Sequence, residues 1–177
     1  MTNLQIREIQ PAEYFALEDF LYNALYIPFG EEFPAREVIF KPEIYIYVKD
    51  FGGKDDCGVV AEQNGQLIGA AWTRIIPAYG HIDEQTPELA ISVLPEWHGK
   101  AIGSKLMKHL FELLRTRGYR QTSLSVQKEN PAVRFYERLG YEIVDRSLIV
   151  DRLVVDSDKP VNQSTHQPTD YLMIKIL

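Results

Sequence analysis

The chain has 177 residues, of which 45% are hydrophobic, and carries a formal net charge of −6 with a pI near 5.3. This length can bury one core, and no shift in composition divides it, so we expect a single domain over residues 1–177. The negative charge argues against a nucleic-acid partner, whose phosphates would be repelled, and is compatible with a cationic substrate. Cys57 is the only cysteine, which excludes an internal disulfide.

No apolar run approaches the roughly eighteen residues that a membrane span needs. The charged Arg7 and Glu8 come early in the chain, and no apolar signal-peptide region follows them. We therefore expect a cytoplasmic protein that does not engage a membrane. The oligomeric state stays open, and a homodimer is one of the alternatives.

The first third of the chain predicts a strand, a helix and an irregular aromatic stretch. Leu4–Ile9 alternates polar and apolar residues, as a half-buried strand does. The apolar residues of Pro11–Leu25 recur at helical spacing. The stretch from Tyr22 to Pro34 is rich in tyrosine and phenylalanine and is interrupted by proline and glycine. Its aromatic residues are compatible with packing at the edge of the core.

The next segments predict a second helix and a hairpin. Ile44–Val48 is rich in strand-forming residues, but the preceding Pro42-Glu43 is typical of a helix start, and we predict a helix. Asn64-Gly65 is the strongest hairpin signal in the sequence, because both residues tolerate the positive φ of a tight turn. It joins the predicted strands Val59–Glu62 and Leu67–Trp72.

A turn suited to an anion lies between the strand Leu89–Leu94 and an amphipathic helix that starts near Ser104. The first N–H groups of a helix have no internal partner, and the helix dipole adds about half a positive charge there. The small residues Gly99, Ala101 and Gly103 would let a phosphate approach this backbone. The alternative is a simple tight turn. The spacing excludes both a P-loop and a dinucleotide-binding fingerprint.

A further strand and a capped helix follow. Gln121–Val126 alternates polar and apolar residues. Asn130 is predicted as the N-cap of a short helix that begins at Pro131 and ends at Gly140, the expected left-handed residue. Two late strands are predicted at Tyr141–Val155 and Tyr171–Leu177. A polar loop is expected between them, over residues 156–170.

The segment from Val93 to Tyr141 resembles the acyl-coenzyme A binding core of the GNAT superfamily of N-acetyltransferases. The resemblance rests on Val93–Ser104, on Asn130-Pro131-Ala132 and on Phe135–Tyr141. The family turn follows the pattern Arg/Gln-x-x-Gly-x-Gly/Ala, and its amides hold the coenzyme pyrophosphate. This chain departs from that pattern with His98 at the Arg/Gln position and Ala101 at the first glycine.

The resemblance implies an α/β (α+β) fold, with a mixed, mostly antiparallel sheet of about six to seven strands and about four flanking helices. It also implies transfer of an acetyl group from acetyl-coenzyme A to a primary amine, on a small molecule or a peptide, without a metal. In related proteins the region around Tyr22–Pro34 forms part of the acceptor pocket. The implied coenzyme-binding residues are Ile91, Val93, His98, Gly99, Lys100, Ala101, Ile102, Gly103, Ser104 and Asn130.

Two residues are the candidates for chemistry. Tyr136 matches the family tyrosine that protonates the leaving thiolate, although a buried core tyrosine would have the same sequence pattern. Glu88, at the start of the strand that would carry the coenzyme, is our first choice of general base, with an ordinary strand-end carboxylate as the alternative. His81, Asp83 and Glu84 are rival bases. A non-catalytic acyl-coenzyme A sensor and a pure interaction module remain alternative functions.

Overall fold

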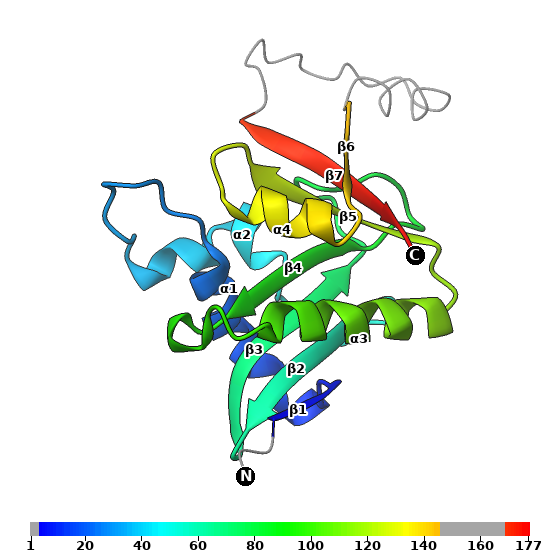
Figure 1. Ribbon diagram of the computed structural model, residues 1–177, viewed down its shortest axis with the longest axis horizontal. Helices are drawn as coiled ribbons and strands as arrows, with labels where there is room; N and C mark the ends of the chain where they lie inside the picture. The colour runs from blue at the N-terminus through cyan, green and yellow to red at the C-terminus, as the bar shows by residue number, and fades with distance from the viewer. Residues whose placement is uncertain (1–3, 146–168) are drawn as a thin grey trace.

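The computed structural model describes residues 4–145 and 169–177. Seven strands form one sheet in the order β1-β2-β3-β4-β5-β7-β6 (Figure 1). Its strands are β1 (Leu4–Glu8), β2 (Cys57–Gln63), β3 (Gln66–Arg74), β4 (Glu88–Val93), β5 (Gln121–Gln127), β6 (Glu142–Val144) and β7 (Asp170–Ile176). Neighbouring strands are antiparallel except for β4 and β5, which are parallel. The predicted mixed, mostly antiparallel sheet is confirmed.

Helices cover both faces of this sheet (Figure 1). The α-helices are α1 (Leu17–Ala24), α2 (Pro42–Tyr45), α3 (Ile102–Thr116) and α4 (Ala132–Arg138), and shorter 3₁₀ segments span Pro11–Ala16, Arg36–Phe40 and Pro95–Trp97. The apolar face of α3, with Leu106, Leu110 and Leu114 fully buried, packs on one side of the sheet. The buried residues of α1 pack on the other side around Trp72. This two-sided packing explains why β2 and β3 are almost entirely buried.

The first predicted helix is confirmed in position but is divided into two parts. Pro11–Ala16 forms a 3₁₀ helix, and α1 begins only at Leu17. The Glu13 carboxylate accepts hydrogen bonds from the Gln10 N–H at 2.9 Å and from Arg7 at 2.6 Å. These bonds fix the first turn against β1, and the helix takes its regular α form after that anchor.

The second helix and the hairpin form where the sequence predicts them. α2 covers only Pro42–Tyr45 and continues as successive turns to Asp50, which has a positive φ of 52°. Asn64 and Gly65 have φ values of 52° and 79°, as a two-residue hairpin turn requires. The hairpin pairs Gln63 with Gln66.

Two boundaries near the C-terminal end differ from the sequence prediction. α4 begins at Ala132 rather than at Pro131, although Pro131 already has helical dihedrals and the Asn130 side chain accepts a hydrogen bond from the Ala132 N–H at 2.9 Å. The predicted strand from Tyr141 to Val155 contains β6 over Glu142–Val144, and its remainder beyond residue 145 lies outside the described residues. Most of the predicted loop at 156–170 lies there as well.

Candidate active site

The sheet separates between β4 and β5. These parallel strands pair at one position, Glu88 with Ser123, and then diverge toward their carboxyl ends (Figure 1). β4 is held along its whole length by β3, and β5 along its whole length by β7. The inner edges of two firmly held strands therefore face each other across a gap that no described strand fills.

The backbone of Ile91 and Val93 faces this gap. The Leu94 N–H donates to the Ile68 carbonyl of β3 at 2.9 Å, and the direction of backbone groups alternates along a strand. The odd-numbered residues of β4 consequently direct their amides and carbonyls toward β5. An extended ligand lying beside β4 would meet these backbone groups, as an added strand does.

His98 already occupies one of these backbone groups. Its Nε2 lies 2.7 Å from the Val93 carbonyl oxygen, which accepts the hydrogen bond. The ring is thus bound to the end of β4 and helps to fix the following turn. Lys100 is also engaged locally, since its ammonium lies 4.3 Å from the centroid of the Trp97 ring. These contacts make both side chains parts of the turn itself.

The turn before α3 has the geometry of an anion cradle. Gly99 and Ala101 both have positive φ, 72° and 57°, and the first backbone bond of the helix runs from the Lys105 N–H to the Ala101 carbonyl. The amides of Ile102, Gly103 and Ser104 therefore precede the helical hydrogen-bond ladder. A Cβ on Gly99 would meet no atom within 4 Å, so the space above this glycine is open. The Ile102 side chain is buried in the core, which leaves only its backbone for a ligand.

We predict that Ala101→Gly stabilises the fold. A left-handed conformation costs a residue with a Cβ about 1–2 kcal/mol, whereas glycine loses about 0.5–1 kcal/mol in the unfolded chain. The free energy of unfolding should rise by about 0.5–1 kcal/mol, measured by urea denaturation, and coenzyme affinity should be equal or better. Ala16→Gly is the control, because Ala16 has a right-handed φ of −68° and should lose stability. A loss of stability in Ala101→Gly would contradict the strain argument.

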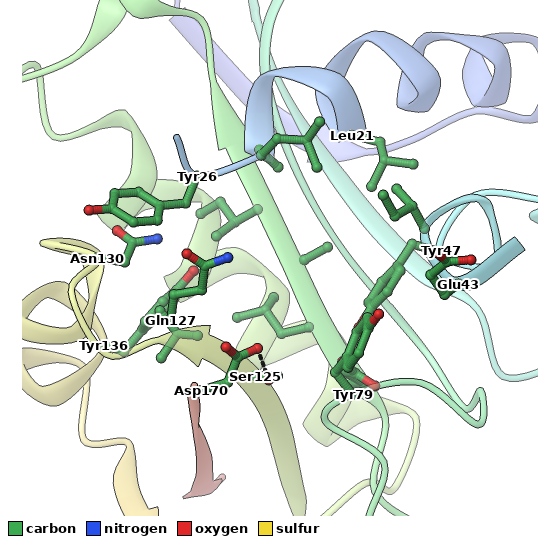
Figure 2. A pocket seen from close by; sticks show the side chains of 18 of the residues that line it. Leu21, Tyr26, Glu43, Tyr47, Tyr79, Ser125, Gln127, Asn130, Tyr136 and Asp170 are labelled. Carbon is green, nitrogen blue, oxygen red and sulfur yellow. Dashed lines mark hydrogen bonds between the residues drawn. The ribbon is translucent and has the colours of Figure 1, made fainter. Parts of the chain in front are cut away.

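A cavity of about 430 Å³ occupies the gap between β4 and β5 and extends over the α1 and α2 face. Figure 2 shows its two sides. One side carries Tyr26, Gln127, Asn130 and Tyr136, and the other carries Glu43, Tyr47 and Tyr79, with Asp170 and Ser125 between them. Residues from widely separated parts of the chain thus reach one shared space.

Glu88 belongs to the lining of this cavity, although the residue is only 3% exposed. Its Oε1 accepts hydrogen bonds from the Tyr47 hydroxyl and, at 2.8 Å, from the Gly80 N–H. Burial, and then the neighbouring Glu88 charge, raise the pKa of Tyr47 far above its usual value, so this hydroxyl remains a donor. A buried carboxylate with two donors has a fixed orientation.

Tyr136 reaches the cavity from α4. Burial raises the pKa of Tyr136 to about 12, so the hydroxyl keeps its proton at neutral pH. Its ring packs edge-on against Tyr141 at 5.8 Å between centroids. Within residues 4–145 and 169–177, no side chain or backbone group makes a hydrogen bond to this hydroxyl. Tyr136 is therefore both a packed aromatic residue and a proton donor available to a ligand.

The rival bases lie away from this space. His81, Asp83 and Glu84 are in the loop before β4, and none of them lines the cavity. The Asp83 carboxylate accepts a hydrogen bond from the Gln85 N–H at 2.8 Å, and the Glu84 side chain is 86% exposed. Glu88 is the candidate base that lines the same cavity as Tyr136. Across the described residues, no three histidine, cysteine or acidic side chains form a group that could hold a metal.

Several cavity residues have no sequence signal of their own. Tyr47 lies in a segment whose only sequence signal is a helical tendency, and Tyr79 lies in a loop without a motif. Asp170 falls at the end of the predicted polar loop, yet it begins β7 and accepts a hydrogen bond from Ser125 at 3.2 Å (Figure 2). Only the pairing of β5 with β7 places Asp170 in the cavity.

Comparison with known proteins agrees with this architecture. The model of the acetyltransferase (GNAT) family matches residues 17–141. An acetyltransferase of Pectobacterium atrosepticum is 31% identical over 104 residues, which cover 58% of this chain and 70% of the relative. An acetyltransferase of Yersinia pestis is 29% identical over 101 residues, covering 56% of this chain and 67% of the relative.

Solved structures share the fold at low sequence identity. The PaiA N-acetyltransferase of Thermoplasma acidophilum, in complex with coenzyme A, superposes with a TM-score of 0.64 at 17% identity and covers 99% of each chain. The ribosomal-protein-S18-alanine N-acetyltransferase of Escherichia coli has a TM-score of 0.62 at 18% identity, over 98% of this chain and 94% of that one. These likenesses show the fold.

The chain belongs to the GNAT acetyltransferase family. The resemblance found in the sequence is confirmed, and with it the expectation of an acetyltransferase enzyme. Within the described residues, no helix is both long and apolar enough to cross a membrane.

Proposed function

We propose that this protein transfers the acetyl group of acetyl-coenzyme A to a primary amine by direct attack within a ternary complex. The observation that carries the proposal is the cavity between β4 and β5, which Glu88 and Tyr136 enter from different elements. The amides of Gly99–Ser104 would hold the pyrophosphate, and the free edge of β4 at Ile91 would hold the pantetheine arm. Asn130, beside Tyr136, would contact the same arm.

Glu88 and Tyr136 divide the proton transfers in this proposal. An ammonium with a pKa near 10.4 costs about 4.6 kcal/mol to deprotonate at pH 7, so a base is useful. Glu88 would take this proton, directly or through a water molecule. The nitrogen forms a bond to the thioester carbon, and the carbon–sulfur bond then breaks. Tyr136, protonated at neutral pH, would donate to the leaving sulfur.

The cavity wall supports a cationic acceptor. Its charged residues are Glu43, Glu88 and Asp170, and within the described part of the chain neither lysine, arginine nor histidine lines it. Tyrosine rings on both sides add faces that attract cations. An anionic acceptor would enter this wall against repulsion, whereas an ammonium would be attracted.

The experiment that tests the function is an acceptor screen with acetyl-coenzyme A. The panel contains putrescine, phenethylamine, lysine amide and a peptide that begins with alanine. The peptide is included because two solved structures of this fold are named as ribosomal-protein-alanine acetyltransferases. Thiol release should be accompanied by acetylated amine in the mass spectrum. Tight coenzyme binding without transfer to any amine would instead support an acyl-coenzyme A sensor.

We expect Asp170→Asn to weaken binding of a cationic acceptor. Removing one carboxylate from a partly enclosed wall should raise the Michaelis constant for putrescine about 3- to 10-fold, because an attraction of about 0.7–1.4 kcal/mol is lost. The Michaelis constant for acetyl-coenzyme A should not change. Asp83→Asn is the matched control, since Asp83 lies outside the cavity. Equal effects of the two variants would contradict a local role of Asp170.

A further inference from the structure

Two separate segments donate hydrogen bonds to the carboxylate of Glu88, and a third segment holds one of them in place. The Tyr47 hydroxyl arrives from the turns after α2, and the Gly80 N–H arrives from the loop before β4. The third segment is β5, whose Ser123 donates its hydroxyl to the Gly80 carbonyl at 2.7 Å. A carboxylate at an ordinary strand end is exposed to solvent, whereas that of Glu88 is enclosed by protein groups.

Tyr47 is itself held at both ends. Its backbone carbonyl accepts a hydrogen bond from Nε1 of the fully buried Trp72 at 2.9 Å. Its hydroxyl donates to Glu88 at the other end of the side chain. The ring packs with the residues of α1 and β3 on the same face of the sheet. The position of the hydroxyl is therefore fixed by the core and does not depend on a ligand.

Gly80 leaves no space for Glu88 to move on its other side. A Cβ at position 80 would lie 2.7 Å from both Cδ and Oε1 of Glu88, closer than atoms can approach. The carboxylate thus lies between a glycine backbone and a tyrosine hydroxyl. Together these two residues restrict the long Glu88 side chain to one arrangement.

We propose that Tyr47 is a positioning residue for Glu88, a residue of the cavity lining, and that its hydrogen bond holds the carboxylate in one orientation and in the charged form that accepts a proton. This inference rests on the proposed function, in which Glu88 is the base. A hydrogen bond donated to a carboxylate favours its charged form, and a fixed rotamer removes the cost of orienting it during reaction. Tyr47 touches the base and acts through it.

The test is Tyr47→Phe, which keeps the ring and removes the donor. We expect kcat to fall about tenfold with the amine that the wild type acetylates, because a hydrogen bond to a charged group is lost. The acid limb of the pH profile should move up by about one pH unit, since the charged carboxylate loses stabilisation. This variant leaves the other titratable side chains of the cavity lining in place, namely Tyr26, Glu43, Tyr79, Tyr136 and Asp170. The Michaelis constant for acetyl-coenzyme A should also stay unchanged.

Tyr45→Phe is the matched control. Tyr45 donates to a glutamate as well, Glu18 at 2.7 Å, but it does not line the cavity. This variant loses the same kind of bond from the same segment and should keep the wild-type kcat and pH profile. A similar fall in both variants would reduce the role of Tyr47 to general stability and overturn the proposal.

Glu88→Gln separates this inference from the proposed function. If Tyr47 acts through Glu88, adding Tyr47→Phe to Glu88→Gln should lower kcat little further. If the two residues acted independently, the fold reductions in kcat of the two single variants would multiply. A low kcat in Glu88→Gln with a normal kcat and pH profile in Tyr47→Phe would overturn only the positioning role. Wild-type turnover in Glu88→Gln would overturn the base and the positioning role together. Gly80→Ala, which displaces the carboxylate by a clash, should reproduce the loss of kcat.

Discussion

Gly103→Glu is expected to abolish coenzyme binding in a folded protein. Gly103 lies in the first turn of α3, and a Cβ there would contact Phe135 at 3.4 Å and Ile91 at 4.0 Å. A glutamate at this point must extend toward the open side of the turn, where it would fill the anion cradle and repel phosphate. Calorimetry with acetyl-coenzyme A should show an affinity loss of about 100-fold or more, equivalent to about 2.7 kcal/mol.

Two control variants separate the effects of side-chain size and of charge on coenzyme affinity. Gly103→Ala adds one methyl group at ordinary contact distance and should keep most of the affinity. Ser104→Glu places the same charge at an exposed neighbouring position without the clash, so it should give an intermediate loss. Coenzyme fragments that lack the pyrophosphate should bind all variants similarly. If such fragments bind the wild type as tightly as the whole coenzyme, the turn is not the anchor.

The second large effect is expected for Tyr136→Phe. The variant keeps the ring contacts with Phe135 and Tyr141 and loses only the hydroxyl. Turnover should fall by about 10²-fold, the lower end of the range for general acid catalysis, because a thiolate with a pKa near 8.5 is already a fair leaving group. Coenzyme affinity should remain near that of the wild type.

Tyr141→Phe is the control for this change. Tyr141 packs against Tyr136, but its hydroxyl is buried away from the cavity lining. Its loss should affect the free energy of unfolding more than turnover.

The raised pKa of Tyr136 predicts how activity depends on pH. Since burial raises it to about 12, activity should not fall from ionisation of Tyr136 between about pH 7 and pH 10. Equal turnover by the wild type and Tyr136→Phe would return Tyr136 to a packing role.

The coenzyme side of the site could be predicted from the sequence because it is built from one continuous segment. The turn, α3 and α4 are encoded by local signals: small residues at positive φ, an apolar helical stripe, and the Asn130 side chain, which accepts a hydrogen bond from the Ala132 N–H although Pro131 is the N-cap of α4. Alanine replaces the family glycine at position 101, and the sequence alone does not show whether this residue has a positive φ. The structure gives Ala101 a φ of 57°, so the left-handed conformation is kept. His98 is different, because its bond to the Val93 carbonyl depends on how the turn folds back on β4.

The acceptor side could not be predicted in the same way because it is assembled from distant segments. Tyr47 and Glu88 are 41 positions apart in the chain and meet only because the turns after α2 pack against the sheet. Asp170 enters through the insertion of β7 between β5 and β6, a pairing that follows no local pattern. The division of the first helix coincides with the side-chain bonds of Glu13, which propensities do not specify.

The most direct measurement is a crystal structure with coenzyme A bound. We expect the pyrophosphate on the amides of Gly99–Ser104 and the pantetheine arm along the free edge of β4. The sulfur should lie within hydrogen-bond reach of the Tyr136 hydroxyl, on the side of the cavity that faces Glu88. A coenzyme bound outside the gap between β4 and β5, or a sulfur remote from Tyr136, would contradict the proposed coenzyme site and the role of Tyr136 as proton donor.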